Sequence, residues 1–311
     1  MYKRQNYNNH IGVPLTLLNA DSTAEILIVE MGTNQKGDID FLCKIAAPTA
    51  GIITNIGFAH LEKLIDQEGV FQEKSSLFKH VEERIGVIFR NTDDTYLSDY
   101  KKGLSEIVDY NANGFHSTQI ELNDGDAKYL SCNVTASGQE YILNTKLVGS
   151  YNLNNISSAL CIGGFYGVPM GQAIHAISDY IPDNMRSQLI ATERNSVVID
   201  AYNANPSSMS ESISAFLKIE GEGRILILGD MLELGEQAEQ FHQQILNMSE
   251  IQRAEKVILV GDIFCAIGHA YNSYENVEDL LASNILKQLK DKSILVKGSR
   301  GIQLEKVLVQ L

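Results

Sequence analysis

The stretch "RILILGDM" (residues 224–231) decides the fold class, because it is an unbroken apolar run that ends in a glycine and an acidic residue. Three similar runs occur in the same half of the chain: "SVVIDAYN" (196–203), "KVILVGD" (256–262) and "SILVKGSR" (293–300). Helical patterns lie between these runs, and one more helix is expected after the last. Strands that are apolar throughout, rather than alternating, are typical of parallel sheets covered on both faces. The pattern of apolar runs and helices in the second half of the chain therefore predicts a Rossmann-like α/β domain.

The first half shows the same alternation. The runs "EILIVEMG" (25–32), "AGIITNIG" (50–57) and "IGVIFR" (85–90) predict strands, with helices over about 38–46 and 66–80. From about 104 to 148, short alternating runs between Gly, Asn and Asp turns predict an appended β-meander. Two helical patterns, "NLNNISSALCIGGFYG" and "MGQAIHAISDYI", follow it.

We place the domain boundary near residues 182–184. The expected architecture is α/β: a mostly parallel central sheet with helices and a β-meander in residues 1–183, followed by a smaller Rossmann-like α/β domain in residues 184–311. Two such domains would leave a cleft between them.

Composition narrows the class of protein. Against 25 basic residues there are 39 acidic ones, and a net charge of -14 argues against general affinity for nucleic acid or anionic lipid. No apolar run reaches the roughly 18 residues of a membrane span, and the first residues of the sequence do not have the pattern of a signal peptide. The four cysteines are far apart and form no CxxC pair, which favours buried free thiols. We expect a cytoplasmic monomer, although an exposed sheet edge could encourage self-association.

Several polar residues follow predicted strands, where ligands bind in open parallel sheets. They are Glu30, the segment from Asn55 to His60, Asp200 and the run that starts at Gly229. An acid at a strand end is more often a cap or an ion-pair partner than a metal ligand, and a lone histidine is more often structural than catalytic. Both interpretations stay open for Glu30 and His60.

Lys74 occupies an unusual position in "GVFQEKSSLFK" (69–79). On a helix, the apolar residues Val70, Phe71, Leu77 and Phe78 share one face, and Lys74 falls in the middle of it. An ammonium group there is costly unless it is paired or chemically altered. The ordinary interpretation is a lysine that reaches the rim of the core. The functional one is a desolvated amine that takes up carbon dioxide to become a carbamate and a metal ligand.

The second half offers candidates for binding phosphate and ribose. Asp200 ends a strand and precedes a turn that contains Asn203, which suits a nucleotide ribose or ordinary turn chemistry. Lys297 and Arg300 flank a glycine after the last strand, as in an anion site at the start of a helix. Arg186, near the domain boundary, could reach a phosphate or could lie on the surface.

Nine stretches together resemble the Mur ligase family. In chain order they are "NYNNHIGVPLTLL", "VEMGTNQKGDI", "TNIGFAHLE", "EKSSLF", "GSYNLNNISSAL", "NMRSQL", "DAYNANPSSM", "GDMLELG" and "LVKGSR". They occur in the family's order and run from about residue 5 to the C-terminal region. Each is moderately specific alone, and nine in sequence are strong. The runs "DAYNANPSSM" and "GDMLELG" favour the family member that joins D-alanyl-D-alanine to UDP-N-acetylmuramoyl-tripeptide in peptidoglycan synthesis.

The resemblance implies an ATP-dependent amide ligase that activates the tripeptide carboxylate as an acyl-phosphate, which the amine of the dipeptide then attacks. It implies that a carbamylated Lys74, with Glu30 and His60, organises Mg²⁺, a cation that prefers oxygen ligands. Arg186 would meet the terminal phosphate of ATP. The other implied contacts to the nucleotide are Asn152, Asn155, Asp200, Tyr202 and Asn203. The implied contacts to the two substrates are Asn9, Asn34, Asn55, Asp230, Glu233, Lys297, Ser299 and Arg300.

One family feature is missing from the 311 residues. They contain no G-x-x-G-K-[ST] phosphate loop, whose backbone amides, lysine and hydroxyl hold the phosphates and the metal. The family carries that loop and the domain that binds UDP before the "NYNN" segment. We therefore expect residues 1–183 to be a central domain truncated at its N-terminus, and the chain alone to be inactive as a ligase.

Two alternatives remain. The chain could be a non-catalytic module that keeps part of a nucleotide site, or a related ligase such as a folylpolyglutamate synthetase. Magnesium-dependent ATP binding without turnover would favour the first alternative, and a substrate screen would test the second.

Overall fold

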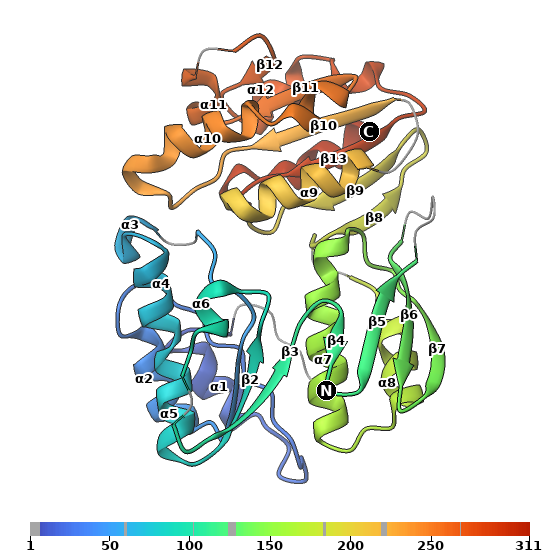
Figure 1. The fold of residues 1–311 in the computed structure, drawn as a ribbon. Coiled ribbons are helices and arrows are strands. Elements are labelled where there is room, and N and C mark those ends of the chain that lie inside the picture. Colours follow the sequence, from blue (N-terminus) through green and yellow to red (C-terminus); the bar gives the residue numbers. More distant parts are fainter. Residues whose placement is uncertain are drawn as a thin grey trace. The chain divides into compact units, whose positions relative to one another are not determined.

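The computed structural model describes residues 7–58, 61–101, 103–123, 129–182, 185–218, 223–267 and 269–311. The chain divides into two compact units, Met1–Asn111 and Ala112–Leu311 (Figure 1). The boundary that we expected at 183 and 184 falls on residues outside the described ranges and stays a prediction.

Unit 1 contains a parallel three-stranded sheet in the order β1-β2-β3 (Figure 1). Its strands are β1 (Ala50–Ile53), β2 (Val87–Asn91) and β3 (Glu106–Tyr110). Its helices are α1 (Gly12–Leu18), α2 (Asp38–Ala46), α3 (Leu61–Leu64), α4 (Gln67–Lys74), α5 (Ser76–Glu83) and α6 (Thr95–Ser98). Helix α5 packs on β1 so closely that a Cβ on Gly51 would lie 3.1 Å from Leu77 and Val81. This packing fixes α4, which directly precedes α5, against the sheet.

The strand predicted at 25–32 is wrong. These residues form no strand, and the side chains of Ile26, Leu27 and Ile28 are 53%, 45% and 69% exposed. An apolar run becomes a strand only when a neighbouring strand pairs with its backbone. Among the described residues this segment has no such partner. A backbone hydrogen bond runs from the N–H of Gly32 to the carbonyl oxygen of Asn8, over 2.7 Å.

Two smaller expectations also change in unit 1. The helix expected over 66–80 is two helices, α4 and α5, with Ser75 between them. The start of the segment expected to be a meander, residues 106–110, is β3, which pairs in parallel with β2.

The first part of unit 2 is the predicted meander. An antiparallel sheet runs β4 (Gly114–Phe115), β5 (Thr118–Leu122), β6 (Ser131–Ala136) and β7 (Gln139–Asn144). The helices α7 (Leu153–Phe165) and α8 (Met170–Asp179) cover it, and η1 (Ser150–Asn152) leads into α7. Buried Cys132 and Leu143 of the sheet belong to one core with Ile156 and Leu160 of α7. The meander and the two helices after it are therefore confirmed.

The second part of unit 2 is a six-stranded sheet in the order β12-β11-β10-β13-β9-β8. Its strands are β8 (Gln188–Ala191), β9 (Ser196–Asp200), β10 (Arg224–Gly229), β11 (Lys256–Val260), β12 (Asn272–Tyr274) and β13 (Ser293–Lys297). Its helices are α9 (Pro206–Lys218), α10 (Ala238–Leu246), α11 (Asp262–Ala266) and α12 (Val277–Ala282). The short 3₁₀ helices are η2 (Gly235–Gln237), η3 (Ser249–Arg253), η4 (Leu286–Gln288), η5 (Arg300–Ile302) and η6 (Leu304–Gln310).

All four strands that we predicted for this half are present, and only β8 runs antiparallel to its neighbour. The helix expected at the C-terminus is the 3₁₀ segment η6. Alternate residues of the sheet face opposite layers, so Val197 and Ile199 pack with Leu280 and Leu304.

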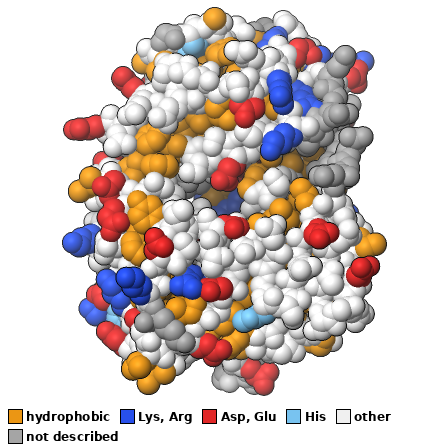
Figure 2. Space-filling view, in the orientation of Figure 1, with side chains coloured by type: hydrophobic (Ala, Val, Ile, Leu, Met, Phe, Trp, Pro, Cys, Tyr) orange, Lys and Arg blue, Asp and Glu red, His pale blue; other side chains and the backbone are white. Residues whose placement is uncertain are grey.

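On the face in Figure 2, acidic side chains are scattered rather than gathered into one patch. No helix among the described residues is long and apolar enough to cross a membrane.

Candidate active site

Lys74 ends α4 with its side chain half-buried against the exit of β1. Its Nζ donates a hydrogen bond of 2.9 Å to the backbone oxygen of Asn55. Burial lowers the pKa of Lys74, and the charge of the Asp94 carboxylate opposes that shift. Asp94 also accepts from the N–H of Ile56 over 2.6 Å, which fastens the same strand exit to the start of α6. The amine therefore lies beside the residues that follow β1.

The other predicted residues of unit 1 lie at exposed loops or helix starts. Glu30 is exposed, and its Oε1 accepts from the side-chain amide of Asn8 over 3.3 Å. Asn9 accepts from the first backbone N–H groups of α1. The side chains of Asn34 and Asn55 are exposed.

The described residues do not form a metal site by themselves. No group of three His, Cys, Asp or Glu side chains among them is placed to hold a metal ion. His60, one of the three expected ligands, lies outside the described residues. Glu30 and Lys74 are described, and no contact joins them.

Glu73 is a residue that the sequence reasoning missed. Its carboxylate is 3% exposed and accepts from the N–H of Gly37 over 2.7 Å and of Ile39 over 2.8 Å. The hydroxyl of Thr33 donates to it over 3.3 Å. Glu73 therefore fastens the loop before α2, which carries Asn34, to the turn of α4 that carries Lys74. The sequence holds one sign of this buried position: Glu73 lies three residues after the apolar Val70, and residues at this spacing share one face of a helix.

In unit 2, Asp200 and Lys297 form a buried ion pair where β9 and β13 end side by side. Asp200 is 9% exposed and Lys297 1%, and the two residues are register partners. Lys297 Nζ donates to Asp200 Oδ2 over 2.5 Å. Ser212 Oγ also donates to Oδ2, and the N–H of Ser187 donates to Oδ1 over 3.2 Å. Both oxygens expected to meet a ribose thus already accept internal hydrogen bonds.

The ion pair separates the two cations of the expected anion site. Lys297 points inward to Asp200, whereas Arg300 is exposed. The guanidinium carbon of Arg300 lies 5.6 Å from the ring centroid of Tyr202, and that of Arg186 lies 4.1 Å from the same centroid. Tyr202 therefore brings together two arginines that are far apart in the sequence.

Tyr151 extends this cluster from η1, just before α7. Its hydroxyl lies 2.5 Å from the Oγ of Ser187, the residue after Arg186. Burial raises the pKa of Tyr151 to about 12, and the Asp200 charge adds to the shift. The phenol is therefore a neutral hydrogen-bonding group at physiological pH.

The remaining predicted residues of unit 2 are of two kinds: buried side chains with internal hydrogen bonds, and exposed side chains. Asn152 is buried, and its amide donates to the backbone oxygen of Val148. Asp230 is 2% exposed and accepts from two N–H groups at the start of α11, while Ser299 accepts from the N–H of Leu232. The exposed side chains are those of Asn155, Asn203 and Glu233. The substrate and adenine roles of these residues stay predictions.

Comparison with known protein families accounts for both units. The model of the Mur ligase middle domain matches residues 2–163, and the model of the Mur ligase glutamate ligase domain matches residues 185–300. The first match alone spans more than half of the chain. The chain therefore belongs to the Mur ligase family, as its nine motifs indicated.

Within the family, three similar proteins are MurF homologues. The UDP-N-acetylmuramoyl-tripeptide--D-alanyl-D-alanine ligase of Bacillus subtilis is 32% identical over 98% of this chain and 68% of its own length. The Escherichia coli protein of the same name is 27% identical over 99% of this chain and 70% of its own. MurF from Thermotoga maritima, solved in complex with ADP, has the same fold, with a TM-score of 0.85 at 23% identity over 99% of this chain and 71% of that one.

Proposed function

We propose that this chain is the central and C-terminal part of an ATP-dependent ligase that adds D-alanyl-D-alanine to UDP-N-acetylmuramoyl-tripeptide. The observation that carries the proposal is the 32% identity over 98% of the chain to the Bacillus subtilis protein of that name. The two exposed arginines beside a strand end in unit 2 support it, because phosphoryl transfer needs positive charge near the phosphate.

The proposed reaction has two steps. The carboxylate of the tripeptide attacks the terminal phosphorus of ATP, which forms an acyl-phosphate and releases ADP. The amine of the dipeptide then attacks the acyl carbon, inorganic phosphate leaves, and the amine loses one proton. Arg186 would face the phosphoryl group in both steps. Catalysis of this kind comes mainly from positioning and charge neutralisation.

Lys74 is the proposed site of carbamylation. Its neutral amine would add to carbon dioxide, form an N–C bond and lose one proton, which leaves a carboxylate-like group. Its half-buried position beside the exit of β1 supports this assignment. With Glu30 and His60, the carbamate would hold Mg²⁺, whose chemistry is to neutralise charge on phosphate oxygens.

The proposal is tested with two proteins: the chain alone, and the chain joined to the amino-terminal third of the Bacillus subtilis relative, which would supply a phosphate loop. We expect the chain alone to release negligible phosphate from ATP. The joined protein should release phosphate only when the UDP-muramoyl-tripeptide and D-alanyl-D-alanine are both present. An Arg186→Gln version of the joined protein is the matched control and should lose most of that activity.

Three results would contradict parts of the proposal. Turnover by the chain alone, at the rate of an intact ligase, would refute its inactivity. Phosphate release that depends on a folate and glutamate would favour the folylpolyglutamate alternative. A folded joined protein that binds ATP without any turnover would favour a non-catalytic module.

A further inference from the structure

Arg186 and Arg300 are two exposed cations held on one aromatic ring. Their guanidinium carbons lie 4.1 Å and 5.6 Å from the centroid of the Tyr202 ring, which bounds their separation at about 10 Å. Within the part of the chain that the structure describes, neither guanidinium forms an ion pair with a carboxylate. Two like charges at this distance repel, and an anion that contacts both removes the repulsion.

Asp200 links the two segments that carry the arginines. It precedes Tyr202 by two residues and accepts from the N–H of Ser187, the residue after Arg186. It also accepts from Lys297, which precedes Arg300 by three residues. One buried carboxylate therefore anchors both of the segments that carry the arginines.

The segment around Arg186 is held in an uncommon conformation. Met185 and Ser187, on either side of it, have φ values of 58° and 50°, in the left-handed region that non-glycine residues rarely adopt. Such residues persist where the surroundings fix them, and they gather at functional sites. Here the fixing contacts are the bonds from Ser187 to Asp200 and to Tyr151.

We infer that Asp200 and Tyr202 are positioning residues that direct Arg186 and Arg300 onto a single phosphoryl group. This inference deepens the proposed function and rests on it for the source of that group. Each guanidinium offers a planar fork of N–H donors that matches phosphate oxygens. Two guanidiniums match a phosphate dianion in charge and in donor number better than they match a carboxylate, which has one charge and two oxygens.

The inference adds to the roles of two residues. Asp200, expected to bind ribose, would also act within the protein, since both of its oxygens accept internal hydrogen bonds. Arg300, expected near the dipeptide or the acyl-phosphate, shares its anion with Arg186. The phosphoryl group would come from the terminal phosphate of a nucleotide or from an acyl-phosphate. The pair of arginines, Arg186 and Arg300, suits both sources.

The test follows the side-chain ¹⁵Nε resonances of arginine in the intact chain, assigned by Arg186→Gln and Arg300→Gln. Inorganic phosphate should shift both resonances with one shared Kd, and acetate at equal ionic strength should shift neither. Loss of either arginine should weaken phosphate binding by about tenfold, the effect of losing one charge-assisted hydrogen bond. Tighter binding of acetyl phosphate or of a non-hydrolysable ATP analogue then identifies the source.

Tyr202 variants separate positioning from general stability. Tyr202→Leu removes the ring and should weaken phosphate binding by about tenfold, whereas Tyr202→Phe keeps a stacking face and should stay within about threefold of the parent chain. Different Kd values for the two arginines, a shift of only one, or equal binding of acetate would overturn the inference. So would unchanged phosphate binding in a folded Tyr202→Leu chain. Because no turnover is measured, failure of the ligase assay would leave these results intact.

Discussion

Glu73 provides a quantitative prediction about unit 1. Its buried carboxylate accepts from two backbone N–H groups, those of Gly37 and Ile39, at 2.7 and 2.8 Å. Glu73→Gln keeps the shape but turns an amide N–H₂ toward one of these donors, which should cost about 2 kcal/mol. Glu73→Ala leaves both donors without an acceptor and should cost about 3–4 kcal/mol.

Amide hydrogen exchange measures this loss where it occurs. A loss of about 2 kcal/mol speeds opening by about 30-fold, so peptides that cover residues 33–41 should exchange by about that factor faster in Glu73→Gln. Glu73→Ala should exchange faster still. Peptides from unit 2 should not change, since the carboxylate contacts only unit 1.

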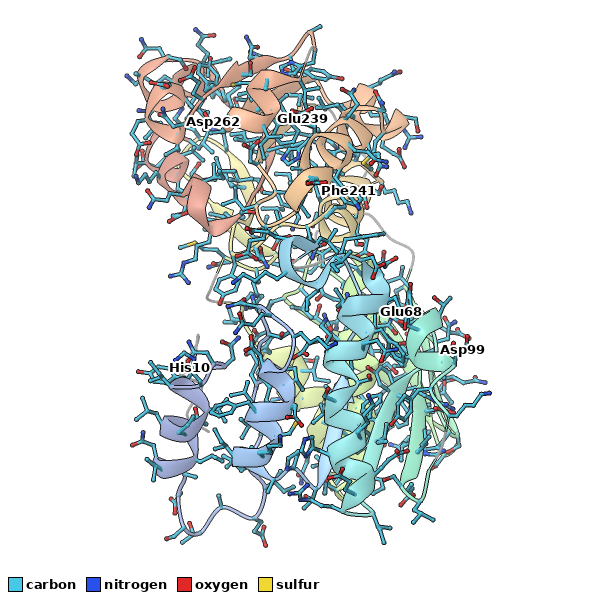
Figure 3. The ribbon with its side chains drawn as sticks, turned by 90° about the vertical axis from the view of Figure 1, so that its left-hand side faces the viewer. His10, Glu68, Asp99, Glu239, Phe241 and Asp262 are labelled. Atoms are coloured by element: carbon cyan, nitrogen blue, oxygen red, sulfur yellow. The ribbon has the colours of Figure 1, made fainter. Side chains whose placement is uncertain are left out.

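Glu68→Gln is the matched control. Glu68 lies on the same helix at the surface (Figure 3), where its carboxylate accepts an exposed hydrogen bond from the side-chain amide of Gln72. Its substitution should change exchange in residues 33–41 by less than about threefold. If Glu73→Gln exchanged like the parent chain over these residues, the carboxylate would not anchor the loop before α2.

Three further predictions concern single groups. Lys297→Met should lower the free energy of unfolding by about 3 kcal/mol, because it leaves the Asp200 charge buried without its partner. Urea unfolding followed by circular dichroism measures this loss, and an unchanged unfolding midpoint would contradict the prediction. The ¹³Cε resonance of Lys74 should titrate below the ordinary value of 10.5, so this group makes folding more favourable as pH rises from its lowered pKa toward 10.5. Lys74→Arg should remove that resonance, and titration at or above 10.5 would refute the burial argument. A thiol reagent should modify the partly exposed Cys265 before the buried Cys43, whose pKa burial raises to about 12; equal rates in the folded chain would be inconsistent with this packing.

The sequence predicted best those elements whose signal is local. Unbroken apolar runs identified β9, β10, β11 and β13, because a strand buried on both faces is apolar at most of its positions. The meander was recognisable from its turns and its alternation. The run 25–32 carries the same local signal and forms no strand, since pairing depends on a neighbour that the run itself does not specify.

The arrangement of the site was harder to predict, because it depends on pairings between distant residues. Asp200 and Lys297 were both noted at strand ends, but nothing in their local sequence shows that β9 and β13 are neighbours in register. The stacking of Arg186 and Arg300 on Tyr202 depends on the same pairing. Glu73 follows the same rule, because the N–H groups that donate to its carboxylate belong to Gly37 and Ile39, which lie 36 and 34 residues earlier in the chain.

The most direct test of the account follows oxygen atoms through the proposed reaction. The joined protein described above is given ATP, D-alanyl-D-alanine and UDP-muramoyl-tripeptide labelled with ¹⁸O in its terminal carboxylate. An acyl-phosphate route predicts that each amide bond formed sends one ¹⁸O into inorganic phosphate, which mass spectrometry detects. Amide formation with unlabelled phosphate, or phosphate release without the dipeptide adduct, would contradict the assignment of this chain to that reaction.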